Sequence, residues 1–332
     1  MTTPPADPIA KPRSARLSAP ALIQRQGALI ALAALTVFGA LRYPHFLDVY
    51  NVAEFFRDNA GYGLIALGMT FVIITGGIDL SVGAVAALAS VVAALVSPHG
   101  LVAALGAAVL AGGLVGLFNG LLIARLNLLP FIVTLATLLA ARGGALLLAH
   151  NATVGIDTQH GFGNLYNSDV GGVPTPALLL LAAFALGSLV LNFTRFGRYA
   201  LAVGGGEEAA RLMGLPVTQV KLGVYALSGA LAGLAGALLA GQTFTGVPTE
   251  GLGWELTAIA SVVVGGTLLT GGAGSVGTTL VGALLLGLIF NVLNFENGRG
   301  TLTLSAYWQS VIRGLFLLLV VVGQSRLARK RV

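Results

Sequence analysis

Long apolar runs with almost no charged residues recur along the chain, and they restrict its environment. Only 9% of the 332 residues are charged, whereas soluble domains carry about 25%. A membrane-spanning helix needs roughly 20 mostly apolar residues. The runs cover residues 27–41, 60–75, 81–96, 101–124, 130–149, 175–194, 221–242, 255–269, 277–294 and 306–323. The sequence therefore predicts an all-α polytopic membrane protein with about ten transmembrane helices.

The basic residues predict the orientation of these helices. With the N-terminus inside, thirteen of the eighteen lysines and arginines fall in cytoplasmic segments, and most acids fall outside. This agrees with the positive-inside rule, so both termini are expected in the cytoplasm. We expect a disordered cytoplasmic tail at 1–26, a transmembrane domain at 27–323 and a basic tail at 324–332. The net charge of +6 thus reports topology and does not indicate a nucleic-acid partner.

The sequence lacks the usual means of energising transport or catalysis. It has no cysteine and no phosphate-binding Gly-x-x-x-x-Gly-Lys-Ser/Thr loop. Ionisable groups inside a membrane often mark ion pathways, and the spans hold only Arg142 and Arg313, with Asp79 near an end. We therefore expect no catalytic residue, cofactor or metal site in this chain. Either the chain is passive or a partner supplies the energy, and an ion-coupled transporter remains a weaker alternative.

The longest cytoplasmic connection, residues 195–221, contains features of a short helix. Three glycines at 204–206 are expected to break the chain before it. Glu207 and Glu208 then suit the positive end of a helix dipole, and Gly214 can cap its end. A helix of one or two turns is unstable alone, so it must be braced by packing.

This short helix has two interpretations. It is a solvated connector, or it is a coupling helix that docks on an ATPase subunit and transmits its closure to the spans. The residues that would carry the coupling are Glu207, Glu208, Arg211, Met213 and Gly214.

A second glycine motif lies between the second and third spans. Gly76 and Gly77 interrupt the helix, and Asp79 and Ser81 stand where the next one begins. Either side chain could cap the free amide groups of that helix, which is the simpler role. The alternative places these four residues, with Asn119, at a gate or along a transport pathway.

A related sequence, Thr-Gly-Gly-Ala-Gly-Ser-Val-Gly, occurs at residues 270–277. Both motifs lie at predicted cytoplasmic ends of helix pairs, which suggests that the two hairpins pack in comparable ways. Among single residues, we expect Arg142 to pair with a backbone carbonyl or a neighbouring helix. Asn119 and Asn291 are expected to form hydrogen bonds between helices.

These motifs resemble the permease subunits of bacterial monosaccharide ABC importers, of the ribose, xylose, arabinose and galactofuranose type. The resemblance covers about residues 60 to 323, and the sequence Thr-Gly-Gly-Ile-Asp-Leu-Ser-Val-Gly-Ala at 75–84 is among its most specific parts. The other matching segments are 119–120, 130–135, 195–198, 208–215 and 254–267. Residues 258–295 look most like one of the two galactofuranose permease subunits. Related permeases for amino acids or nucleosides share the architecture and remain an alternative.

The resemblance implies partners that the sequence alone does not show. It implies a second permease subunit, identical or different, a separate ABC ATPase that holds ATP and Mg²⁺, and a periplasmic sugar-binding protein, all at the bacterial inner membrane. Most sugar specificity would then reside in the binding protein. Two positions depart from the family pattern: Gly206 stands where Asn is common, and Thr257 where Asp is common.

Overall fold

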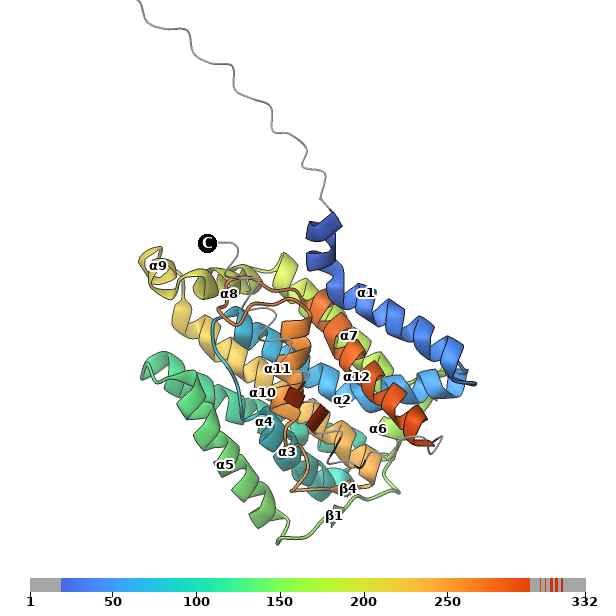
Figure 1. Cartoon of the computed structure of the whole chain (residues 1–332). Coiled ribbons are helices and arrows are strands. Elements are labelled where there is room, and N and C mark those ends of the chain that lie inside the picture. The colour runs from blue at the N-terminus through green and yellow to red at the C-terminus, as the bar shows by residue number, and fades with distance from the viewer. Residues whose placement is uncertain are drawn as a thin grey trace, which may run out of the picture.

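The computed structural model describes residues 19–298 and scattered positions between 305 and 318. Residues 1–18, most of the tenth predicted span with Arg313, and the basic tail at 324–332 lie outside the described residues. The described chain is a helical bundle (Figure 1). Its helices are α1 (Ala19–Arg42), α2 (Val49–Ile74), α3 (Val82–Val96), η1 (Ser97–His99), α4 (Leu101–Arg125), α5 (Pro130–Leu148), α6 (Asn164–Asn167), α7 (Thr175–Phe193), α8 (Arg195–Gly205), α9 (Glu207–Leu212), α10 (Val217–Thr243), α11 (Trp254–Val264) and α12 (Val276–Gly298).

Each of the first nine predicted spans corresponds to one of these helices. Within the described residues, six helices are long and apolar enough to cross a membrane: Val82–His99, Leu101–Arg125, Pro130–Leu148, Thr175–Phe193, Val217–Thr243 and Val276–Asn297. Gln26–Arg42 and Trp254–Val264 are shorter apolar helices. The total of ten spans stays a prediction.

Two helices extend beyond the apolar runs that predicted them. α1 begins at Ala19, inside the segment expected to be a disordered tail. α2 begins at Val49, so the predicted span at 60–75 covers only its apolar half. Hydropathy misses the first half because Glu54, Arg57 and Asp58 lie there.

The helix α10 forms the centre of the bundle and packs against α2, α3 and α4 (Figure 1). Glycines allow the backbones of α4 and α10 to touch. A Cβ atom on Gly112 would lie 2.2 Å from the carbonyl oxygen of Gly229, and one on Gly229 would lie 2.1 Å from that of Gly112. Small residues permit this close approach between membrane helices, which explains many of the glycines in the apolar runs.

Short strands tie together the connections at the predicted external end. β1 (Val154–Gly155) pairs antiparallel with β4 (Thr245–Gly246), and β2 (Asp169–Val170) pairs with β3 (Val173–Pro174). Arg142 of α5 donates to the carbonyl oxygen of Pro248 at 2.6 Å and also to that of Glu250. The predicted pairing of Arg142 with a backbone carbonyl is confirmed.

Candidate functional site

Three glycine segments far apart in the sequence meet at the predicted cytoplasmic end of the bundle. The backbone N–H of Gly272 donates to the carbonyl oxygen of Ile74, at the end of α2, over 2.9 Å. A Cβ atom on Gly204 would lie only 1.7 Å from that same oxygen. One on Gly271 would lie 2.8 Å from the nitrogen of Gly76. We call Gly76, Gly204, Gly205, Gly271 and Gly272 the glycine junction.

Backbone conformation adds a second requirement for glycine at this junction. The φ angles are 81° at Gly76, 80° at Gly271 and 77° at Gly272. Residues with a Cβ atom rarely adopt this left-handed region. The related motifs at 75–77 and 270–272 therefore do more than pack alike, because they pack against each other.

The break expected at residues 204–206 is only partly present. α8 continues through Gly204 and Gly205, and the chain leaves the helix at Gly206, where the backbone is extended (φ 170°). The prediction of a break at Gly204 was wrong because that glycine serves close packing against Ile74. The local sequence carries no sign of this tertiary contact.

α9 is the short helix expected after Gly206, and its end is capped as predicted. Gly214 has a φ of 77°. Its N–H donates to the carbonyl oxygen of Arg211 at 3.0 Å, and that of Leu215 donates to Ala210 at 3.0 Å. This pair of bonds is a Schellman motif. At the start of α9, Gly206 supplies no side-chain cap.

An ion pair that the sequence analysis missed braces α9 against α10. Glu207 accepts from Lys221 at 2.6 Å and from Arg211 at 3.2 Å. The Lys221 side chain is only 13% exposed, so this contact is better shielded from water than a typical surface pair. The two partners are fourteen residues apart and lie on different helices, so no i,i+3 or i,i+4 pattern indicates the pair.

Several other side chains of α9 and its C-cap residue Met213 are exposed, and two of them are apolar. Leu212 is 84% exposed and Met213 is 69% exposed. Glu208 and Arg211 are also exposed there. The ion pair with Lys221 thus fixes α9 to α10, while two apolar and two charged side chains of this segment remain exposed.

Asp79, in the connection between α2 and α3, is buried within a network of hydrogen bonds. Its carboxylate accepts from the Ser81 hydroxyl at 2.6 Å, the Ser81 N–H at 3.0 Å and the Ser228 hydroxyl of α10 at 2.9 Å. Ser81 is the N-cap residue of α3, yet its side chain caps no helix amide. Of the two side chains that could cap α3, Ser81 does not, because its hydroxyl donates to Asp79. Asp79 satisfies the amide of Ser81 itself.

The network continues from Ser81 through Asn119 into α5. The Asn119 amide donates to the Ser81 hydroxyl at 3.0 Å and accepts from the Thr137 hydroxyl at 2.6 Å. The predicted interhelical bonds of Asn119 are confirmed, and Ser228 and Thr137 are members that sequence reasoning missed.

Gly77 lies beside this network, where a Cβ atom would be 2.4 Å from the Tyr225 hydroxyl oxygen. Asp79 and Ser81 are each 1% exposed and Asn119 is 0% exposed. The structure thus joins Asp79, Ser81 and Asn119 in one buried cluster. Along the chain, Asp79 follows Gly76 of the glycine junction by three residues.

Comparison with known proteins places these features in context. Residues 51–321 match a family model described as branched-chain amino acid transport system / permease component. The ribose import permease protein RbsC of Bacillus subtilis is 40% identical over 304 residues, covering 91% of this chain and 92% of that protein. RbsC of Escherichia coli is 37% identical, covering 92% and 95%. The L-arabinose ABC transporter permease protein AraH of Azospirillum brasilense is 36% identical, covering 97% and 93%. No solved structure matches the chain.

Proposed function

Because the chain belongs to this family of transport-system permease components, we propose that it is the membrane subunit of an ATP-driven importer of a monosaccharide. One observation carries the proposal: ribose and arabinose permeases are 36–40% identical to the chain over at least 91% of its length. The chain is a multi-pass membrane protein and a transporter component. We place it in the bacterial inner membrane, with the permease domain at 27–323 between two cytoplasmic tails.

The energy comes from a partner in this proposal. A separate ABC ATPase subunit holds ATP and Mg²⁺, and a periplasmic sugar-binding protein delivers the substrate. A second permease subunit, either a copy of this chain or a related one, completes the translocation pathway.

The exposed face of α9 is the surface that we assign to the ATPase. Leu212 and Met213 offer apolar side chains to a groove, and Glu208 and Arg211 flank them with charges of both signs. Apolar anchors with a charged rim are typical of protein interfaces. Gly214 ends α9 so that the chain can turn back into α10.

Two structural routes lead from α9 into the bundle. The first is the ion pair from Glu207 to Lys221, at the start of α10. The second is α8, whose end contacts α2 and the loop at 271–272 through the glycine junction. When the ATPases close and α9 moves, both routes transmit the displacement to helices that reach the other end of the bundle.

We assign the region from Gly76 to Ser81, with Asn119, to the cytoplasmic gate. It adjoins the glycine junction, and Asp79 connects the start of α3 to α10 through Ser228. If α10 shifts relative to α3, the hydrogen bond from Ser228 to Asp79 must break, or Asp79 must move with α10.

Uptake by cells tests this function. The chain is expressed with an ABC ATPase subunit and a periplasmic sugar-binding protein, in cells lacking other ribose and arabinose importers. Import of labelled ribose or arabinose should persist with a protonophore and stop with vanadate. A protonophore-sensitive import that needs no ATPase subunit would instead assign an ion-coupled transporter.

Glu208→Lys tests the coupling surface within the same assay. This variant should abolish uptake while the subunit inserts and melts like the wild type, because Glu208 is exposed. Gln219→Lys adds a positive charge at an exposed position of α10, close to α9, and should retain uptake. Normal uptake by Glu208→Lys would contradict the assignment.

A second substrate class has one observation in its favour, since the description of the family model names branched-chain amino acids. ATP-dependent uptake of leucine that ribose and arabinose do not compete with would assign that class.

A further inference from the structure

A cavity of about 300 Å³ opens at the end of the bundle opposite the glycine junction. This volume is at the lower end of the range for small-molecule sites, about 300–1,000 Å³. Helices α2, α10, α11 and α12 contribute to its walls. Its polar and aromatic lining includes Asp58, Asn59, Tyr62, Gln242, Trp254 and Asn291.

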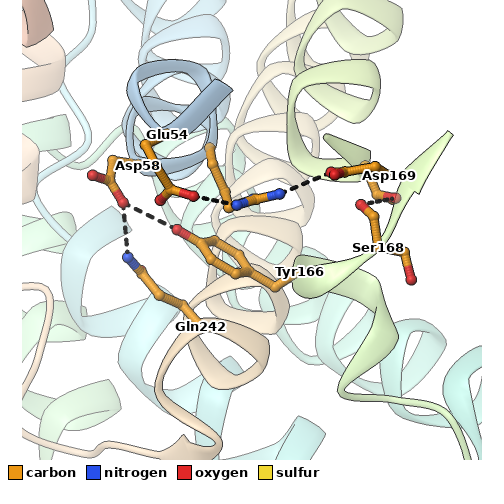
Figure 2. Close-up of polar contacts among 8 residues, drawn as sticks. Glu54, Asp58, Tyr166, Ser168, Asp169 and Gln242 are labelled. Atoms are coloured by element: carbon orange, nitrogen blue, oxygen red, sulfur yellow. Dashed lines mark hydrogen bonds and ion pairs between the residues drawn. The ribbon is translucent and has the colours of Figure 1, made fainter. Parts of the chain in front are cut away.

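One wall of the cavity is built around the carboxylate of Asp58. Its Oδ1 atom accepts from the Tyr166 hydroxyl at 3.1 Å and from the Gln242 amide at 3.2 Å. Figure 2 shows these three side chains converging from α2, α6 and the end of α10. Burial, followed by the nearby Asp58 carboxylate, raises the pKa of Tyr166 above its ordinary value, so the phenol stays protonated as a donor. A carboxylate and an amide both have further hydrogen-bonding capacity.

The charge of the neighbouring arginine is already compensated. Arg57 forms ion pairs with Glu54 and, at 2.8 Å, with Asp169; these two acids are labelled in Figure 2. Among the described residues that line the cavity, only Arg57 and Asp58 carry a formal charge at neutral pH. With Arg57 engaged by two acids, the cavity has no free cation to attract an anionic ligand, and its lining is suited to a neutral polar one.

A second wall is aromatic. The rings of Tyr62 and Trp254 lie with their centroids 4.8 Å apart at an interplanar angle of 51°. The face of an aromatic ring is electron-rich, and the C–H groups on one face of a sugar ring carry partial positive charge. A sugar can therefore stack on this wall while its hydroxyls point to the polar one.

The third wall contains asparagines whose positions are fixed. The Asn59 amide donates to the carbonyl oxygen of Phe55 at 2.7 Å. A Cβ atom on Gly287 would lie 2.1 Å from Asn59 Oδ1, so only glycine at that position of α12 leaves room for this side chain. The amides of Asn291 and Asn51 bond each other across α12 and α2 at 3.2 Å. Side-chain amides both donate and accept, as hydroxyl groups require.

We infer that this cavity is a monosaccharide-binding site within the permease itself, at its external end. The inference rests on the proposed function and adds a specific site to it. An arginine compensated by two acids, amides on the first and third walls and an aromatic pair on the second together favour a small neutral polyol. The site is linked to the coupling region, because α2 runs from Asp58 to the glycine junction and α10 runs from Lys221 to Gln242.

Tryptophan fluorescence can report on this site directly. The chain has two tryptophans, so Trp308→Phe leaves Trp254 in the cavity wall as the single reporter. The full chain in nanodiscs is titrated with D-ribose, L-arabinose and, separately, leucine. We expect a saturable change with a millimolar Kd for at least one sugar and none for leucine.

Gln242→Leu is the test variant. Gln242 is exposed at the end of α10, so the fold should tolerate the change, while the lost hydrogen bonds should raise the Kd about tenfold. Asn192→Leu removes an exposed amide of α7 that donates to Ser188 on the same helix and should leave the Kd within about twofold. A fluorescence response to leucine alone, or an equal Kd in Gln242→Leu and the control, overturns the inference.

The uptake assay separates this inference from the proposed function. Glu208→Lys should leave the sugar-dependent fluorescence unchanged although it abolishes uptake, which would support a site independent of coupling. If the wild-type system imports ribose or arabinose and neither sugar changes the Trp254 signal, the site is refuted and the importer function stands. If the signal responds to sugar and no import occurs with any partner subunit, the site stands and the importer function is refuted.

Discussion

Replacing Gly204 by alanine tests whether the glycine junction is a fixed contact on which the bundle depends. The added Cβ atom would lie 1.7 Å from the carbonyl oxygen of Ile74 and 2.6 Å from the nitrogen of Gly272. An ordinary C···O contact is about 3.3 Å or more. The end of α8 and the end of α2 must therefore separate by roughly 1.6 Å, the difference between these distances.

The free energy of this separation can be bounded from its parts. Overpacking of a tight contact costs about 1–3 kcal/mol. Loss of the hydrogen bond from Gly272 to Ile74 adds about 0.5–1.5 kcal/mol. The higher helix propensity of alanine returns up to about 1 kcal/mol. The free energy of unfolding should thus fall by about 0.5–4.5 kcal/mol.

The adjacent residue provides a matched control. A Cβ atom on Gly205 meets no other atom within 4 Å, so Gly205→Ala should keep or slightly raise stability through helix propensity. Both variants are purified in nanodiscs, their thermal unfolding is compared, and sugar uptake is measured in cells. Gly204→Ala should unfold at a lower temperature and lose uptake, and Gly205→Ala should do neither. If the two variants behave alike, the close contact at Gly204 has no role in stability or coupling.

Three further measurements test other parts of the structure. Gly116→Leu should destabilise the bundle by about 3 kcal/mol or more, because a Cβ atom there would lie 2.1 Å from a backbone oxygen of α10. A Cβ atom on Gly106 would meet nothing within 4 Å, so the control Gly106→Leu should melt like the wild type. Arg142→Met should cost about 1–3 kcal/mol and speed hydrogen exchange in the external connection whose carbonyls it binds; unchanged exchange would argue against that anchoring role. Since the chain has no cysteine, an impermeant maleimide should label His160→Cys in intact cells and Met213→Cys only after permeabilisation, and the reverse pattern would invert the topology.

Part of the candidate site was predictable because its signals are local. Acids at the start of α9 and glycine after its end follow from the helix dipole and from left-handed backbone geometry, so a few residues suffice to define this helix. Asp79 and Asn119 could be selected because polar residues are rare in these apolar runs. What each of them binds could not be read locally, so the sequence left open whether Asp79 or Ser81 would cap α3.

The sequence by itself determined that the chain spans a membrane and where its apolar helices lie, and it predicts which helix ends share a side. These properties follow from the cost of burying charge and from the length of apolar runs, which are additive over neighbouring residues. Only the tertiary structure decided that Gly204 packs on Ile74, that Glu207 pairs with Lys221, and that α2, α10, α11 and α12 enclose a polar cavity. Such contacts join residues brought together by helix packing, and helix packing depends on the shape of whole helix faces, which no short segment encodes.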